Sequence, residues 1–197
     1  MSLFTQCSAV IATCAFLALP LAAADDAKTM PPGMDPAAME MMKPGPEHQM
    51  LAKRAGTWDV ACKMWMMPDA PAQESKGTAK TTVILDGRYI QDDFTGEFMG
   101  QPFKGMGLTG YDRQEKKYYS TWVDSMSTSM MQMTGTSEDN GKTVTTTGEC
   151  MCPMAKEKIA FRQVEKHTSD DAFTVEMYKT VNGKESKCME LAYTRKK

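Results

Sequence analysis

Histidine and catalytic motifs are scarce in this sequence. Its 197 residues include only two histidines, His48 and His167, and neither a Gly-x-Ser-x-Gly nor a His-Glu-x-x-His motif occurs. A catalytic nucleophile needs a base within hydrogen-bond reach, and the two histidines stand in segments typical of a helix start and an exposed turn. The sequence therefore disfavours hydrolase chemistry and favours a binding protein over an enzyme. Catalysis by carboxylates stays open, with Asp92, Asp93, Glu97 and Asp124 as candidates.

A surplus of basic charge is also missing. The chain has 23 Lys and Arg against 25 Asp and Glu, and the two signs are interspersed. Proteins that bind nucleic acids or anionic membranes normally show a basic excess or a basic patch. We therefore expect no nucleic acid as partner, and no membrane once the N-terminal segment has been removed.

Charge is absent altogether from Leu3 to Ala24. This segment has an apolar centre, and its last three residues are alanines, the small residues that signal peptidase requires. The pattern predicts a signal peptide over residues 1–24, although no Lys or Arg precedes the apolar run. A retained membrane anchor is the alternative. The sequence thus predicts an exported protein, either periplasmic or secreted.

Residues 25–46 form a leader rich in proline and methionine. The five prolines and two glycines of this range predict a flexible segment without a packed helix or strand. The next residues, 47–53, are predicted to form a short helix that Gly56 ends. Residues 47–197 together are predicted to form one folded domain.

Beyond this helix, short alternating segments bounded by turn residues predict about ten β-strands. Apolar residues recur at every second position, as in Trp58, Val60 and Cys62, so each strand has one apolar face. An antiparallel sheet of many strands buries such a face most simply by closing into a barrel, with a two-sheet sandwich as the alternative. The strands are expected at 57–66, 75–85, 88–98, 102–110, 117–124, 128–136, 142–150, 157–165, 172–180 and 185–194.

Three dipeptides predict tight turns between these strands. Asp86-Gly87, Asn140-Gly141 and Asn182-Gly183 combine residues that tolerate positive φ, which a two-residue hairpin turn requires at both centres. Such short links make sequential strands antiparallel neighbours.

Export would leave Cys62, Cys150, Cys152 and Cys188 in an oxidising compartment. Cys150 and Cys152 share one strand face, so they are poorly placed to bond to each other. Cys62 is expected on the apolar face and Cys188 on the opposite face, so they should not pair unless a β-bulge reorients one of them. A native disulfide and free thiols both stay open.

Longer motifs add a family resemblance. These motifs are Glu47-His48, Leu51-Ala52, Ala55-Gly56-Thr57-Trp58, Glu74-Ser75-Lys76-Gly77-Thr78-Ala79, Gly96-Glu97-Phe98-Met99-Gly100 and Ser120-Thr121-Trp122-Val123-Asp124-Ser125-Met126-Ser127-Thr128. Together they resemble the bacterial family called domain of unknown function 1579 (DUF1579) from Pro46 to Arg195. The resemblance implies an all-β fold with a closed antiparallel lipocalin-like β-barrel and one short N-terminal helix, and it leaves the function open.

Gly56-Thr57-Trp58 is also similar to the Gly-x-Trp motif that opens lipocalins. In that family the Trp closes the base of the barrel beneath an Arg from a late strand, which implies that Arg195 lies over Trp58. Cys150-Met151-Cys152-Pro153-Met154 departs from the DUF1579 pattern, as does the large number of methionines.

The segment Gly105-Met106-Gly107-Leu108-Thr109-Gly110 matches the dinucleotide-binding fingerprint letter by letter. That fingerprint works only between a strand and a helix, whose N-terminal amides bind the pyrophosphate. A turn and another strand are predicted to follow here, so we reject nucleotide binding and interpret the glycines as part of a strongly bent strand.

The 20 methionines support a second hypothesis. Thioethers and thiolates are soft ligands that suit Cu(I), so Cys150, Cys152 and Met154 are candidate metal ligands in a periplasmic copper-binding protein. The alternative is that methionine fills irregular spaces in the core.

The leading hypothesis is a barrel that binds a small, largely apolar molecule in its interior. An inward Asp124 would need a partner, for which Arg88 is a candidate, although Asp124 could instead begin a turn. An enzyme acting on a small molecule in the barrel is the third hypothesis. The candidate ligand-binding residues are Trp58, Arg88, Tyr111, Trp122, Asp124, Tyr193 and Arg195.

Overall fold

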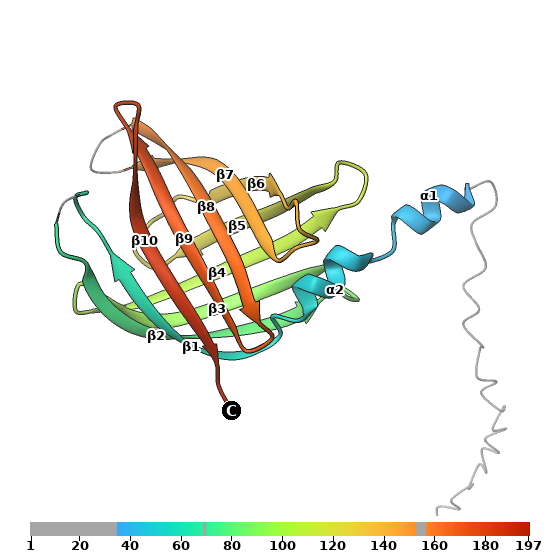
Figure 1. Ribbon diagram of the computed structural model, residues 1–197, viewed down its shortest axis with the longest axis horizontal. Coiled ribbons are helices and arrows are strands. Elements are labelled where there is room, and N and C mark those ends of the chain that lie inside the picture. The colour runs from blue at the N-terminus through green and yellow to red at the C-terminus, as the bar shows by residue number, and fades with distance from the viewer. Residues whose placement is uncertain (1–34, 69, 153–156) are drawn as a thin grey trace, which may run out of the picture. The chain divides into compact units, whose positions relative to one another are not determined.

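The computed structural model describes residues 35–68, 70–152 and 157–197 (Figure 1). The predicted signal peptide and the first part of the predicted leader, up to residue 34, lie outside the described residues. The described part contains two short helices, α1 (Pro36–Met41) and α2 (Pro46–Ala52). Its strands are β1 (Gly56–Met64), β2 (Gln73–Ile84), β3 (Tyr89–Phe98), β4 (Gln101–Asp112), β5 (Lys117–Asp124), β6 (Met131–Thr136), β7 (Thr143–Cys152), β8 (Glu157–Ser169), β9 (Ala172–Val181) and β10 (Lys184–Arg195).

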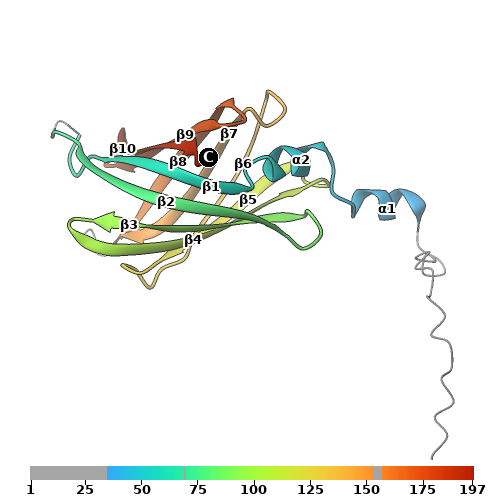
Figure 2. The same cartoon turned by 90° about the horizontal axis from the view of Figure 1, so that it is seen from below.

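The strands form one closed antiparallel barrel. Each strand pairs with the next one in sequence, and β1 completes the ring by pairing with β10 (Figures 1 and 2). Closure leaves no strand edge unpaired, which removes a template for aggregation. The prediction of an all-β closed barrel of about ten strands is confirmed, and the sandwich alternative is wrong.

One of the three predicted two-residue hairpins is present. Asn182 and Gly183 both have positive φ, and the residues that flank them, Val181 and Lys184, pair directly. The loop around Gly87 spans residues 85–88 instead, and the loop around Gly141 spans residues 137–142.

The part of the predicted flexible leader that the structure describes is helical. Helix α1 begins with Pro36 and is capped by Asp35, whose side chain accepts a hydrogen bond from the Ala37 amide. Arg113 donates hydrogen bonds to the carbonyl oxygens of Glu40 and Lys43, which fixes this segment against the barrel. The prediction excluded a packed helix or strand; α1 is helical but buries none of its residues, and Pro36 takes the first helical position, where proline is well tolerated.

Helix α2, predicted at 47–53, lies at one end of the barrel (Figures 1 and 2). Its Leu51 is buried with Ile90 and Tyr118 in a small apolar cluster. We call this end the floor: it consists of α2 and the connections 85–88, 113–116, 137–142 and 170–171. The opposite end, which includes residues 65–68, 70–72, 99–100, 125–130 and 182–183, is called the far end.

Burial of the inward-facing side chains changes along the barrel. Near the floor, Trp58, Val60 and Phe173 are at most 2% exposed. Inward side chains nearer the far end keep part of their surface exposed although they belong to the same faces. The partly exposed inward residues are Cys62, Met64, Phe94, Phe103, Trp122, Met131, Phe161, Met177 and Leu191.

Two glycines of β4 make room for an inward indole ring. A Cβ atom at Gly105 would lie 2.1 Å from Cζ2 of Trp122, and one at Gly107 would lie 3.3 Å from Cε3. Strand β4 continues through this segment and is followed by β5, so the rejection of a nucleotide-binding fingerprint is confirmed. The glycines serve side-chain packing more directly than strand bending.

Cys62 and Cys188 are both thiols in this structure. The pairing of β10 with β9 shifts register between Lys187 and Met189, at Cys188, whose thiol lies 3.4 Å from the carbonyl oxygen of Met177. The two thiols are not bonded to each other in this structure, although the register shift at Cys188 is the kind of β-bulge for which the prediction left pairing open. Burial raises the pKa of the Cys188 thiol to about 11.

Candidate functional site

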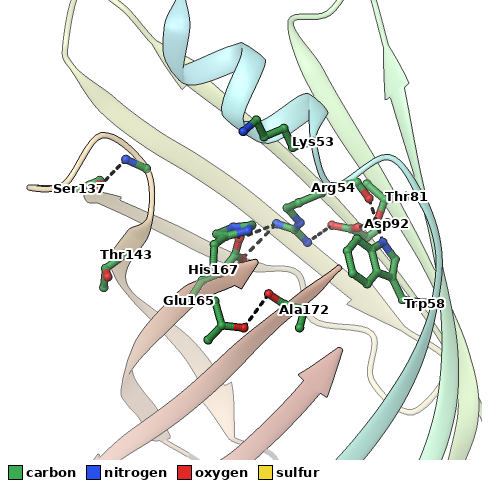
Figure 3. Close-up of polar contacts among 12 residues, drawn as sticks. Lys53, Arg54, Trp58, Thr81, Asp92, Ser137, Thr143, Glu165, His167 and Ala172 are labelled. Atoms are coloured by element: carbon green, nitrogen blue, oxygen red, sulfur yellow. Dashed lines mark hydrogen bonds and ion pairs between the residues drawn. The ribbon is translucent and has the colours of Figure 1, made fainter. Parts of the chain in front are cut away.

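A buried charged cluster lies inside the barrel near the floor. Its central residue, Arg54, follows α2, whose first turn is fixed by a hydrogen bond from the Gly45 amide to Nδ1 of His48. The Arg54 amide donates to the carbonyl oxygen of Leu51 at 3.0 Å, so the chain turns sharply after the helix. Figure 3 shows the Arg54 side chain between side chains from opposite sides of the barrel.

Two carboxylates hold the Arg54 guanidinium. Its Nη2 donates to Oδ2 of Asp92 at 2.8 Å, and its Nη1 donates to Oε2 of Glu165 at 3.0 Å (Figure 3). The Arg54, Asp92 and Glu165 side chains are only 9%, 14% and 9% exposed. A charge taken out of water must be paired, so each member of this trio depends on the others.

The pKa values of Glu165 and Arg54 reflect this pairing. Burial by itself would raise the pKa of Glu165, but the charge of Arg54 and a hydrogen bond from His167 together hold it below the ordinary value. Burial likewise opposes the charged form of Arg54, but Asp92 and Glu165 outweigh it and raise the pKa of the guanidinium. Arg54 and Glu165 therefore both stay ionised at neutral pH.

Neighbouring side chains complete the cluster. The Thr81 hydroxyl donates to Oδ1 of Asp92, and Nε2 of His167 lies 2.8 Å from Oε1 of Glu165. The ring of Phe173 stacks on His167, and its centroid lies 5.1 Å from Cζ of Arg54. The cluster contains two carboxylates and one guanidinium.

The base of the barrel is closed below this cluster. The Trp58 indole donates to the carbonyl oxygen of Arg54 at 2.9 Å, and Cζ of Arg195 lies 4.2 Å from the centroid of the Trp58 ring. The contact between Trp58 and Arg195 that the lipocalin motif implied is present. Trp58 is 1% exposed, which assigns it to packing.

Two predicted tyrosines lie in the interior near the floor. Tyr193 stacks on Phe173 with ring centroids 4.2 Å apart, within the same apolar cluster as Trp58. Tyr111 packs against His48 and against Tyr118, with centroid distances of 6.0 and 4.8 Å.

The remaining predicted residues lie elsewhere. Trp122 and Asp124 lie near the far end of β5, where the indole donates to Oδ2 of Asp124 at 3.1 Å and Oδ1 accepts the Met126 amide at 2.9 Å. Arg88 lies at the floor and donates to the carbonyl oxygens of Leu85 and Met42. Arg88, the candidate partner of an inward Asp124, does not reach it, because Arg88 lies at the floor and Asp124 at the far end.

Family membership follows from a comparison with known sequences. The model of the family described as "Protein of unknown function (DUF1579)" matches residues 43–195, about three quarters of the chain. The chain belongs to the DUF1579 family. No curated protein matches this DUF1579 protein.

Two solved structures share the barrel of this DUF1579 protein. The crystal structure of Rv2717c from M. tuberculosis has a TM-score of 0.58 at 11% identity and covers 79% of this chain and 100% of its own. The S-type phycobiliprotein lyase CPES from Guillardia theta has a TM-score of 0.54 at 13% identity and covers 83% of this chain and 99% of its own. At these identities the likeness concerns the fold.

The copper hypothesis stays a prediction for this DUF1579 protein. Met154 and the side chain of Cys152 lie outside the described residues. Among the side chains that are described, no group of three or more His, Cys, Asp or Glu is placed to hold a metal ion. Nor is any helix of the described ranges long and apolar enough to span a bilayer.

Sequence reasoning missed Arg54, Thr81, Glu165 and His167 as members of one cluster. His167 was interpreted as part of an exposed turn, but β8 extends to Ser169 and places it inside the barrel. The available signal was alternation: Glu165 and His167 continue the inward positions of Ile159 and Phe161. Polar residues at inward positions indicate a paired internal cluster.

Proposed function

We propose that this DUF1579 protein binds a small, largely apolar molecule inside the barrel, with entry at the far end. The observation that carries the proposal is the change in burial along the interior. Aromatic and thioether side chains in the far half face inward yet stay partly exposed, whereas the floor is closed by fully buried side chains. An apolar inner surface that solvent reaches favours a molecule that removes it from water.

The far half contributes aromatic rings to the interior. The rings of Phe94 and Phe103 lie 5.8 Å apart, and those of Phe98 and Phe103 lie 6.3 Å apart. A pocket of about 290 Å³ lies at the same end, beside the hairpin of β9 and β10. It is lined by Met66, Met67, Pro68, Lys179, Val181, Lys184 and Ser186.

Titration with 1-aminoanthracene, a neutral apolar fluorophore, tests this function. We expect saturable enhancement of its fluorescence by the full chain. Leu191→Trp should weaken binding, because Leu191 faces the interior in register with Cys62 and Val175, and a larger ring would fill that space. Ala192→Trp is the matched control, since Ala192 is the next residue on the same strand and is exposed. Equal binding by both variants, each folded by circular dichroism, would contradict interior binding.

We also propose that the protein is exported. The support is the uncharged segment that ends at Ala24. Expression of the full gene in a Gram-negative host, followed by intact mass measurement of the periplasmic fraction, should give a chain that begins at Asp25. A full-length chain confined to the cytoplasmic fraction would contradict export.

A further inference from the structure

The Tyr193 hydroxyl is a polar group in the interior that has no hydrogen-bond partner among the described residues. Tyr193 comes from β10 between Val60 of β1 and Phe173 of β9, and its ring is stacked on Phe173. By contrast, the hydroxyl of Thr81, which belongs to the charged cluster around Arg54, donates to Asp92. No hydrogen bond to the Tyr193 hydroxyl is formed anywhere in the described ranges.

This hydroxyl faces space that solvent can reach. The buried side-chain polar atoms that lack a partner among the described residues are Nε of Arg54, the hydroxyl of Tyr118 and the hydroxyl of Thr146. Tyr193 is not among them and keeps part of its surface exposed, although it lies in the apolar cluster around Trp58. Its hydroxyl is therefore a hydrogen-bonding group available to a molecule in the interior.

The charged residues near Tyr193 determine which kind of ligand group its hydroxyl can bind. Burial, and then the negative charge of Asp92, raise the pKa of Tyr193, so the phenol keeps its proton and acts as a donor. Asp92 and Glu165 outnumber Arg54, whose guanidinium they already occupy. A ligand carboxylate would meet this excess of negative charge without a free cation to pair with.

We propose that the ligand enters with a neutral carbonyl oxygen leading and accepts a hydrogen bond from the Tyr193 hydroxyl at the floor of the interior. This inference rests on the proposed function and narrows it to neutral molecules with an apolar body and a terminal oxygen acceptor. Phe173 supports the tyrosine ring, and the partly exposed side chains of the far half contact the apolar body.

Three naphthalene probes of similar shape test the inference by isothermal titration at pH 8. They are 2-acetylnaphthalene with a carbonyl, 2-ethylnaphthalene without one, and 2-naphthoate with a carboxylate. We expect 2-acetylnaphthalene to bind about three- to tenfold more tightly than 2-ethylnaphthalene, the range of one neutral hydrogen bond. The carboxylate should bind most weakly of the three.

Tyr193→Phe removes the hydroxyl and keeps the ring on Phe173. In this variant the preference for 2-acetylnaphthalene should disappear, while the affinity for 2-ethylnaphthalene stays unchanged. Tyr119→Phe is the control, because Tyr119 is an exposed tyrosine whose hydroxyl donates to Glu115.

The outcomes separate the two proposals. Binding of both neutral probes with equal affinity, a preference that survives Tyr193→Phe, or tightest binding of 2-naphthoate would overturn the inference and leave interior binding intact. Failure of all three probes to bind the full chain would overturn the inference together with the proposed function.

Discussion

The guanidinium of Arg195 covers the ring of Trp58 and joins the two ends of the barrel domain's chain. Its nitrogens donate to the carbonyl oxygens of Lys53 and Ala55 at 2.8 and 2.7 Å, so the last strand holds the segment that leads into β1. The Arg195 Nη1 would also lie 2.5 Å from a Cβ at Gly56, which has a φ of +138°. Only glycine suits both the conformation and the close approach.

Arg195→Gln should lower the free energy of unfolding by about 1.5–3 kcal/mol, because it removes charged hydrogen bonds to carbonyl oxygens and the contact with Trp58. Urea unfolding followed by Trp fluorescence measures the change. Lys196→Gln is the control: its Nζ lies 3.8 Å from Asp59 at an exposed site, and its loss should cost less than about 0.5 kcal/mol. If the two variants lowered the free energy of unfolding equally, Arg195 would not stabilise the closed base of the barrel.

Arg54→Met should be the most damaging of the variants considered. It leaves the Asp92 and Glu165 carboxylates buried without a cation, which costs about 3–5 kcal/mol of the free energy of unfolding. Adding Asp92→Asn and Glu165→Gln to it should restore part of this loss, as thermal unfolding would show. Lys53→Met, at the exposed neighbouring position, is the control.

Acid should destabilise the fold through Glu165. The pKa of Glu165 is lowered in the folded protein, so its contribution to stability is complete above the ordinary glutamate value of about 4.3 and is lost as the pH falls through the lower folded value. The free energy of unfolding of the native chain should therefore fall between about pH 4 and pH 2 more steeply than that of Glu165→Gln. Parallel curves would show that Glu165 does not contribute.

His48 should add a second dependence at higher pH. Burial lowers the pKa of His48, so the unfolded chain takes up a proton first, and stability should fall as the pH drops below about 6.5. His48→Gln should abolish this step while its amide oxygen still accepts the Gly45 amide. The measurement is urea unfolding at pH 7.5, 6.5 and 5.5. A step that persists in the variant would assign it to other groups.

Gly105→Ala should displace the Trp122 ring and destabilise the barrel by about 1–3 kcal/mol, because the new Cβ overlaps the indole. Gly107→Ala should cost less, since its Cβ would approach the ring only to 3.3 Å. In a double-mutant cycle, Trp122→Leu should make Gly105→Ala tolerable. If Gly105→Ala lowered the free energy of unfolding equally with and without the indole, Gly105 would not be needed to make room for the Trp122 ring.

Much of the fold could be predicted from the sequence. The alternation of Trp58, Val60 and Cys62 fixed the inward face of β1, and the dipeptide Asn182-Gly183 fixed an antiparallel hairpin. Helix α1 could not be predicted in the same way. Its single proline, Pro36, does not specify a helix by itself, and the contacts of Arg113 with the carbonyl oxygens of residues 40 and 43 come from a distant hairpin.

The candidate site was likewise predictable only in part from the sequence. Period-two patterning by itself placed Tyr193 on the apolar face of the last strand and put Asp124 on the same face as Trp122, because side-chain direction in a strand depends only on neighbouring residues. Only the tertiary structure decided that Arg54 meets Asp92 and Glu165, which are 38 and 111 residues away in sequence. That meeting depends on the register of the closed sheet and on the turn after α2, and no local pattern encodes a distance around a barrel.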